Sequence, residues 1–271
     1  MSLVTHISFL YTVWMTIIQS FILGIVEGLT EFLPISSTGH LIITHNLLQI
    51  ADSPFVKSFE ISIQLGAILA VFVFYYKKIF QIETIKKLIV GFIPTGIAGL
   101  FLYKHIKQLL ESQITVAITL LIGGIIILFV EKWYSKNIEN NEVNENKEIT
   151  LKQALLLGCY QVLAMIPGTS RSGAMIVGGL LMKIDRKIIT EFTFLLAVPT
   201  MFAATFYTIY KDMSAITNID NLGALSVGFV TSFVVAMIVI KYFLAYIRKH
   251  SFNIFGWYRI IIGVILISIY I

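Results

Sequence analysis

Residues 27–40 read EGLTEFLPISSTGH, and this run lies inside an apolar stretch, Ile7–Leu47. A proline removes a backbone donor and kinks or ends a helix, and an ionised side chain that faces lipid is energetically costly. We therefore expect that this stretch does not cross a membrane as one smooth helix. Residues 167–173, which read PGTSRSG, interrupt a second apolar stretch, Leu151–Met182, in the same way.

The composition excludes an ordinary soluble domain. Of the 271 residues, 57% are hydrophobic and only 13% are charged, whereas a typical globular chain is about 25% charged. The 20 Lys and Arg residues contribute to a net charge of +5 but form no dense run, so we expect no nucleic-acid partner. Basic residues scattered between long apolar stretches are typical of a protein embedded in a bilayer.

Six further segments approach the length of about 20 apolar residues that a helix needs to cross a bilayer. They are Phe59–Tyr76, Leu88–Tyr103, Thr115–Val130, Phe192–Tyr210, Gly223–Tyr246 and Ile254–Ile271. We therefore predict an all-α integral membrane protein with six transmembrane helices. Residues 132–150 are rich in Asn and Glu and are predicted to form a polar linker.

The halves on either side of this linker resemble each other. Gly24–Glu27 with Ser37 recurs as Gly158–Gln161 with Ser170, and three more short matches follow in the same order at separations of 131 to 140 residues. We therefore divide a single transmembrane domain, 1–271, into repeats at about 7–131 and 151–271. Each repeat would hold one re-entrant helical hairpin and three spans, and three crossings would invert the second repeat relative to the first. Many transporters share this inverted-repeat plan, in which irregular backbone lines a polar cavity.

The basic residues indicate the orientation in the membrane. Arg171 and Arg259 fall inside apolar segments, and only Lys57, Lys104, Lys107 and Lys211 fall on the side of the N-terminus, so the other fourteen Lys and Arg residues fall on the opposite side. Cytoplasmic loops carry the excess of basic residues, which predicts that both termini lie outside and the linker lies in the cytoplasm. Residues 7–26 are long enough to span by themselves, and in that case this argument would fail.

Glu27 and Glu31 are four residues apart and therefore share one face of a helix. Two carboxylates in an apolar segment repel each other unless a cation lies between them, which makes both residues candidate ligands of a divalent metal ion. Three hydroxyl groups and an imidazole follow, those of Ser36, Ser37, Thr38 and His40. The alternative is that the glutamates serve helix packing alone, but the neighbouring polar cluster favours a functional site.

Arg171 is the charged residue of the second motif. A glycine-containing turn exposes backbone N–H groups to anions, and the helix that follows adds the positive end of its dipole. The guanidinium adds a donor fork that fits phosphate oxygens, and the hydroxyl residues around it, Thr169, Ser170 and Ser172, are candidate substrate-binding residues. The alternative is a kinked helix in which Arg171 pairs with Glu27 or Glu31 for structure alone.

Together the two motifs offer what phosphoester hydrolysis requires. They supply carboxylates for a divalent cation, an arginine for phosphate charge, and a histidine or serine as nucleophile or proton carrier. A polar cavity within a bilayer indicates a lipid-linked phosphate as substrate. The inverted repeat also leaves open a transporter or flippase for such a lipid, and Glu27 and Glu31 could serve an ion-coupled transporter.

Residues 27–40 and 167–173 closely resemble the two motifs of the undecaprenyl-diphosphate phosphatases of the BacA type, and the resemblance extends from about Gln19 to the C-terminus. It implies a multi-pass enzyme of the bacterial plasma membrane that converts undecaprenyl diphosphate to undecaprenyl phosphate and inorganic phosphate. That reaction recycles the carrier lipid for peptidoglycan and other wall polymers and is linked to bacitracin resistance. The resemblance also implies two re-entrant hairpins, six spans and a site open to the outer side.

The resemblance assigns roles to single residues. Glu27 and Glu31 occupy the acidic positions implicated in binding the diphosphate and a divalent cation, Mg²⁺ or Ca²⁺. Ser37 and His40 occupy the positions debated as nucleophile or as acid and base, and Arg171 occupies that of the phosphate-clamping arginine. We therefore expect His40, Ser37, Glu31 and Arg171 to be catalytic, with the nucleophile left open between Ser37, His40 and a water molecule. A homodimer is compatible with the sequence but not required by it.

Overall fold

The computed structural model describes residues 15–51, 53–110, 112–139, 148–211 and 219–270, and the regular elements within these ranges are α-helices. Six of these helices are long and apolar enough to cross a bilayer. They are α4 (Pro54–Ile79), α5 (Ile82–Leu110), α6 (Gln113–Glu139), α9 (Arg186–Lys211), α11 (Ile219–Ile247) and α12 (Asn253–Tyr270). Each corresponds to one of the predicted spans, so the prediction of an all-α membrane protein with six transmembrane helices is confirmed.

Two pairs of shorter helices form hairpins at the predicted interruptions. The first pair is α2 (Ile17–Thr30) and α3 (Ser37–Leu47), and the second is α7 (Leu151–Leu163) and α8 (Arg171–Leu181). The side-chain amide of Gln19 donates to the carbonyl oxygen of Leu48 at 3.3 Å, so the open ends of the first hairpin meet. None of these four helices has the roughly 20 residues needed to cross a bilayer.

Three expectations from the sequence are untested, fall partly outside the described residues or need adjustment. That each hairpin returns to the side from which it enters stays a prediction. The alternative in which residues 7–26 span the membrane falls partly on residues 1–14, outside the described residues, although α2 itself begins at Ile17. The predicted linker begins later than expected, because α6 continues through Glu139, and residues 140–147 are not described.

The same local chemistry begins each hairpin helix in both halves. Thr16 and Thr150 cap α2 and α7 through matching capping boxes, and Ser36 and Ser170 cap α3 and α8, each with a φ of 72°. A positive φ costs a non-glycine residue about 1–3 kcal/mol and persists where the surrounding structure enforces it. The caps pair Ser36 with Ser170, one residue away from the pairing of Ser37 with Ser170 that the sequence indicated.

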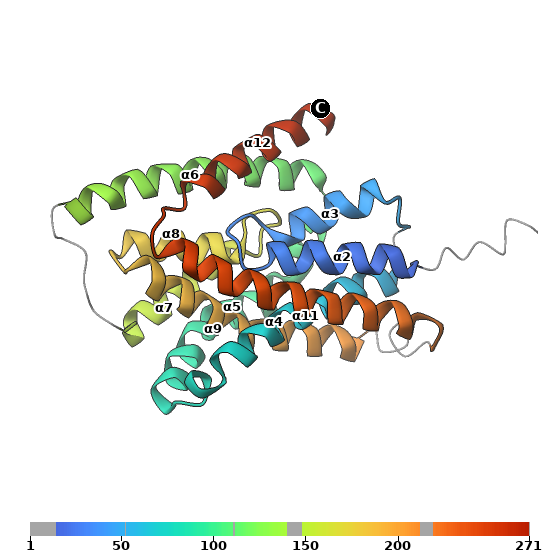
Figure 1. The fold of residues 1–271 in the computed structure, drawn as a ribbon, viewed down its shortest axis with the longest axis horizontal. Coiled ribbons are helices and arrows are strands. Elements are labelled where there is room, and N and C mark those ends of the chain that lie inside the picture. The colour runs from blue at the N-terminus through green and yellow to red at the C-terminus, as the bar shows by residue number, and fades with distance from the viewer. Residues whose placement is uncertain (1–14, 52, 111, 140–147, 212–218, 271) are drawn as a thin grey trace, which may run out of the picture.

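The two halves pack against each other in a reciprocal manner (Figure 1). Helix α2 packs along α11 and α7 packs along α5, while α4 packs on α9 and α6 on α12. The first helix of each hairpin therefore contacts the second span of the other half. Each half thus contributes equivalent helices to the contacts between the halves.

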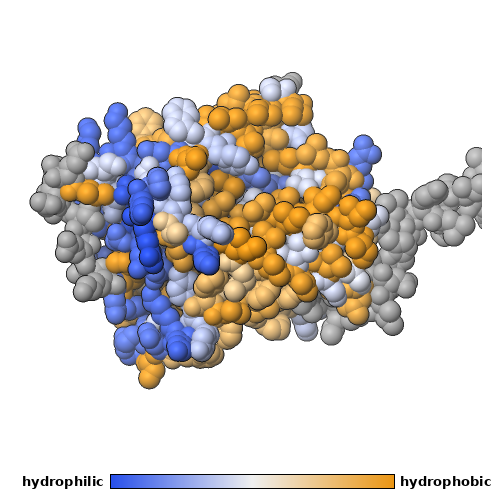
Figure 2. All heavy atoms as spheres, in the orientation of Figure 1, coloured by the Kyte–Doolittle hydropathy of each residue, from blue (hydrophilic) through white to orange (hydrophobic). Residues whose placement is uncertain are grey.

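Hydrophilic and hydrophobic residues occupy different parts of the visible face. Figure 2 shows hydrophilic residues gathered at the end where α6 ends and α7 begins, and hydrophobic residues over most of the remainder. Large apolar side chains remain exposed along the spanning helices, among them Phe101, Phe129 and Phe206. Apolar surface of this extent is rare on soluble monomers, and in a membrane protein it faces lipid.

A buried ion pair joins three spans near this hydrophilic end. The Glu131 carboxylate accepts hydrogen bonds from the Arg186 guanidinium at 3.1 and 2.6 Å and from the backbone N–H of Phe252 at 2.8 Å. The guanidinium also lies 4.7 Å from the ring centre of Tyr134. Because each oxygen of the fully buried carboxylate has a donor, this charge is satisfied within the protein.

The close contact between α2 and α11 depends on glycine. A Cβ added at Gly24 would lie 2.6 Å from the carbonyl oxygen of Gly228 and 2.9 Å from Thr231 Cβ. We expect Gly24→Ala to destabilise the protein by about 1–3 kcal/mol and to lower its melting temperature in detergent. Gly223→Ala is the control, because its nearest neighbour would be 3.7 Å away. Equal melting temperatures for the two variants would contradict this account.

Candidate active site

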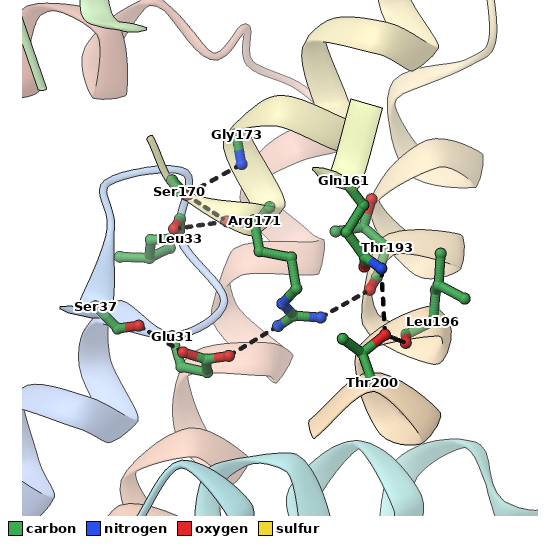
Figure 3. Close-up of polar contacts among 11 residues, drawn as sticks. Glu31, Leu33, Ser37, Gln161, Ser170, Arg171, Gly173, Thr193, Leu196 and Thr200 are labelled. Atoms are coloured by element: carbon green, nitrogen blue, oxygen red, sulfur yellow. Dashed lines mark hydrogen bonds and ion pairs between the residues drawn. The ribbon is translucent and has the colours of Figure 1, made fainter. Parts of the chain in front are cut away.

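The tips of the two hairpins meet inside the molecule (Figure 3). The Ser172 hydroxyl, at the start of α8, donates to the carbonyl oxygen of Leu33 in the turn after α2 at 2.9 Å. The guanidinium of Arg171 lies 2.8 Å from a carboxylate oxygen of Glu31. Residues that are 140 positions apart in the chain are therefore in direct contact.

The Glu31 carboxylate lies at the centre of this contact. One oxygen accepts from Arg171 at 2.8 Å, and the other accepts from the Ser37 hydroxyl at 2.5 Å. The side chains of Arg171 and Glu31 are 12% and 5% exposed, so the pair is largely shielded from solvent. The sequence left open whether Arg171 would pair with Glu27 or Glu31, and the structure selects Glu31.

A cavity of about 230 Å³ opens beside this pair. Six of the predicted site residues line it: Glu31, Ser36, Ser37, Thr38, Ser170 and Arg171. Its remaining polar lining includes Gln64, Thr95, Gln161 and Thr200, and its apolar lining includes Met165 and Met201. The cavity therefore offers the guanidinium of Arg171, the carboxylate of Glu31 and several hydroxyls beside an apolar wall. This combination suits a ligand with a phosphate head and an apolar tail.

Glu27 is completely buried beside this cavity but does not line it. No N–H or O–H group among the described residues donates to either of its carboxylate oxygens, and the Glu31 carboxylate lies beside it. A buried carboxylate without a partner requires a proton or a cation. The described residues contain no group of three His, Cys, Asp or Glu side chains that could hold a metal ion, so a cation at Glu27 would need further oxygens from water or a ligand. Mg²⁺ binds in this way, through one or two carboxylates plus substrate phosphates.

His40 does not line the cavity, although it contacts the backbone of Ser36, which does. Its Nδ1 lies 2.7 Å from the carbonyl oxygen of Ser36, and its Nε2 lies 2.7 Å from the hydroxyl of Tyr258, on whose ring it stacks. Both ring nitrogens thus have partners in the protein. The geometry makes His40 a support for the strained Ser36 turn, and it places Ser37 rather than His40 at the cavity.

The remaining predicted substrate-binding residues of the second motif, Thr169 and Ser172, take part in contacts within and around the turn. Ser172 is buried and contacts both Leu33 and the hydroxyl of Ser170, at 3.1 Å. The carbonyl oxygen of Thr169 accepts from Arg259 at 3.0 Å. Neither Thr169 nor Ser172 lines the cavity, so in this structure both hold the turn in place.

Sequence reasoning missed the polar wall on the far side of the cavity. The side-chain amide of Gln161 donates to the hydroxyls of Thr95 and Thr200 at 2.8 and 3.2 Å, and its carbonyl oxygen is buried without a partner among the described residues. Gln161 occupies the position in the second repeat that Glu27 occupies in the first. That correspondence was the available signal for placing Gln161 in the site.

Comparison with known proteins places the chain in a family. The family described as "Bacitracin resistance protein BacA" matches residues 20–265. The chain belongs to the BacA family. It is 53% identical over 252 residues to the undecaprenyl-diphosphatase of Wolinella succinogenes, and the aligned residues cover 93% of this chain and 97% of the relative. The undecaprenyl-diphosphatases of Sulfurihydrogenibium sp. and Aquifex aeolicus are 52% and 49% identical, each over 93% of this chain and over 98% and 97% of their own lengths.

Two buried glutamates provide a matched test of the site. Glu27 and Glu131 are both 0% exposed, but only Glu131 has hydrogen-bond donors in the described structure. In the presence of a chelator we expect Glu27→Gln to raise the melting temperature, because it removes an unpaired buried carboxylate at a cost of about 1–3 kcal/mol. We expect Glu131→Gln to lower it, because Arg186 then loses its counter-charge.

The measurement is thermal unfolding of the purified variants in detergent with chelator. A lower melting temperature for Glu27→Gln than for the wild type would show that the Glu27 carboxylate has a stabilising partner within the protein, which would contradict this account.

Proposed function

We propose that this protein hydrolyses undecaprenyl diphosphate to undecaprenyl phosphate and inorganic phosphate. The observation that carries the proposal is the arrangement of Arg171, Glu31 and Ser37 around one cavity between the two hairpin tips. Relatives about half identical to this chain over almost their whole length are undecaprenyl-diphosphatases, and a guanidinium, a carboxylate and a hydroxyl are groups that phosphoryl-transfer chemistry can use.

Ser37 is the nucleophile in this mechanism. Its hydroxyl lines the cavity and already donates to Glu31, which is the arrangement of an activated nucleophile beside a base. The Ser37 oxygen attacks the terminal phosphorus, its proton passes to Glu31, and undecaprenyl phosphate leaves. Water then cleaves the serine phosphate ester, which releases inorganic phosphate and restores the hydroxyl.

Arg171 binds the terminal phosphate in this mechanism. One of its terminal nitrogens donates to Glu31, and the other lies 3.4 Å from the carbonyl oxygen of Thr193. A guanidinium has five N–H groups, so donors remain for a phosphate in the cavity. Its planar fork neutralises charge that develops on the phosphate oxygens in the transition state. The pair with Glu31 keeps the guanidinium in position before the substrate enters.

A divalent cation, Mg²⁺ or Ca²⁺, is the proposed cofactor. Glu27 and Glu31 would hold it, and the unpartnered oxygens of Glu27 support this assignment. When bound, the cation neutralises charge on the diphosphate. His40 supports Ser36 through its contact with the backbone carbonyl, and Ser36, Thr38 and Ser170 contribute hydroxyls to the cavity wall.

We further propose that the site opens to the outer side of the bacterial plasma membrane, with both termini outside. Fourteen of the 20 Lys and Arg residues fall on the side of the linker, where the positive-inside rule places the cytoplasm. The reaction would recycle the carrier lipid for cell-wall synthesis, and it would confer bacitracin resistance by lowering the amount of the diphosphate form.

Transport of the lipid phosphate is the second candidate function. The reciprocal packing of the two halves favours it, because inverted repeats in many transporters allow alternating access. Hydrolysis and transport are separable, since a protein that only moves lipid between leaflets releases no phosphate in the absence of a bilayer.

The purified protein should release inorganic phosphate from undecaprenyl diphosphate in detergent micelles. Arg171→Met and Glu31→Gln should each lower the rate by at least about 100-fold, because each removes charge stabilisation at the reacting phosphate. Arg248→Met and Glu83→Gln are matched controls, since both residues are exposed, and both variants should retain the wild-type rate. The absence of phosphate release by the wild type would contradict hydrolysis and leave transport as the function.

Substitutions of Ser37 and His40 distinguish the nucleophile from its support. Ser37→Ala should abolish phosphate release. His40→Asn should lower the rate by only about tenfold, because His40 supports the Ser36 turn and does not transfer a proton. Loss of a general acid or base would lower the rate by about 10²–10⁴-fold. Acid-quenched reactions with substrate labelled in its terminal phosphate should yield labelled protein in the wild type but not in Ser37→Ala. A fully active Ser37→Ala variant would contradict the assignment.

Removal of divalent cations with a chelator tests whether phosphate release requires one. A chelator in excess should stop phosphate release, and added Mg²⁺ or Ca²⁺ should restore it. Glu27→Gln should raise the cation concentration needed for half-maximal rate by about tenfold or more, by analogy with the losses seen when metal sites are weakened. The same concentration dependence in Glu27→Gln and wild type would exclude Glu27 as a ligand.

A further inference from the structure

Arg259, on α12, is a buried cation that the mechanism above does not use. It is 0% exposed and is among the largest fully buried side chains of the described residues. No carboxylate forms a salt bridge with it within those residues, in contrast to Arg171 and Arg186, which pair with Glu31 and Glu131. A charge in this position is costly, so its hydrogen bonds indicate what it contributes.

All five N–H groups of Arg259 donate to backbone carbonyls. Nε donates to Leu120 at 3.4 Å, Nη1 to Pro34 at 3.1 Å and Thr169 at 3.0 Å, and Nη2 to Thr119 at 3.0 Å and Gly168 at 2.9 Å. Pro34 lies in the first hairpin tip, Gly168 and Thr169 lie in the second, and the other two acceptors lie on α6. One side chain therefore joins both tips to the α6–α12 helix pair.

These contacts affect the cavity in two ways. Gly168 lines the cavity, and the neighbouring residues Ser170 and Arg171 carry its phosphate-binding groups. The hydrogen bonds from Arg259 fix the backbone on which these groups stand. They also occupy the carbonyl oxygens of Pro34, Gly168 and Thr169, which would repel a phosphate if they turned toward it.

We propose that Arg259 is a positioning residue of the phosphatase site, and that it sets the separation of the two hairpin tips and hence of Ser37 from Arg171. It does not line the cavity and acts through the backbone that it binds. The inference rests on the proposed function. Lysine cannot replace Arg259, since an ammonium offers three donors and no planar fork.

A glycine on α6 makes room for this guanidinium. A Cβ added at Gly123 would lie 2.1 Å from Nη2 of Arg259, so even alanine would displace the guanidinium. A Cβ added at the next residue, Gly124, would lie 2.6 Å from the carbonyl oxygen of Gly256 and 3.0 Å from Cβ of Arg259, at the base of that side chain and not at its guanidinium. Gly123→Ala and Gly124→Ala therefore both crowd the α6–α12 contact, but only the first collides with the guanidinium.

The test compares Arg259→Lys, Gly123→Ala and Gly124→Ala in the full-length protein in detergent. For each we would measure the melting temperature, kcat and KM for undecaprenyl diphosphate, and the affinity for inorganic pyrophosphate by calorimetry. Arg259→Lys should lower kcat/KM by about 100-fold, the scale of a misplacement of about 1 Å at a catalytic site. Gly123→Ala should lower kcat/KM at least about tenfold more than Gly124→Ala does. The two glycine variants should have similar melting temperatures, and Gly123→Ala should have the higher KM.

Equal kinetic losses in the two glycine variants would overturn the proposal, because they would show a packing effect alone. A wild-type kcat and KM in Arg259→Lys would also overturn it. If Arg259→Lys fails to fold, the glycine pair decides.

If the proposed hydrolysis is wrong but the role of Arg259 is right, the measurements give a different pattern. In that case the wild type would release no phosphate, while pyrophosphate would still bind more weakly to Gly123→Ala than to Gly124→Ala. A wild type that neither hydrolyses the lipid nor binds pyrophosphate would contradict both.

Discussion

The ion pair between Arg171 and Glu31 is the interaction on which the site depends. Charges are scarce in this chain, and a charge within an apolar hairpin is costly unless a partner satisfies it. Arg171 begins the second helix of one hairpin and Glu31 ends the first helix of the other, so their contact at 2.8 Å requires both tips to reach the same point. Neither hairpin by itself contains both charges. The cavity proposed to accept the phosphate is consequently a property of the two halves together.

Other buried polar groups hold the tips where this pair can form. Arg259 donates to carbonyl oxygens of both tips, and the hydroxyl of Ser172 donates to the carbonyl oxygen of Leu33. The Tyr258 hydroxyl contacts His40, which contacts the Ser36 carbonyl. These contacts offset the positive φ of Ser36 and Ser170. Glu27 differs from all of them because its buried oxygens lack a donor among the described residues. The backbone of both tips is therefore held by several hydrogen bonds, while the Glu27 carboxylate has no donor that would compete with a cation.

The sequence predicted the parts of this structure that follow from hydropathy and local chemistry. Apolar length indicated the six spans, and the proline and polar motifs indicated both hairpin turns. Glu31 and Arg171 could be selected because an intramembrane charge is costly, and Ser37 because it belongs to the polar cluster that follows Glu31. What the sequence could not predict depends on rotation and packing. The turn at Ser36 directs Ser37 to the cavity and His40 to Tyr258, and Gln161 reaches the cavity through the packing of α7 on α5. No local pattern shows that Arg259 donates to five carbonyls from three parts of the chain.

The central claim is that Arg171 and Glu31 act as one unit in binding the diphosphate. The most direct test is a double-mutant cycle with Glu31→Gln, Arg171→Met and the double variant, measured as the dissociation constant of a non-hydrolysable methylene diphosphonate of a prenyl chain. Residues in direct contact show interaction energies of about 0.5–3 kcal/mol, whereas independent sites are additive within about 0.5 kcal/mol. We expect a coupling of about 1 kcal/mol or more. Additive effects of the two substitutions would contradict it.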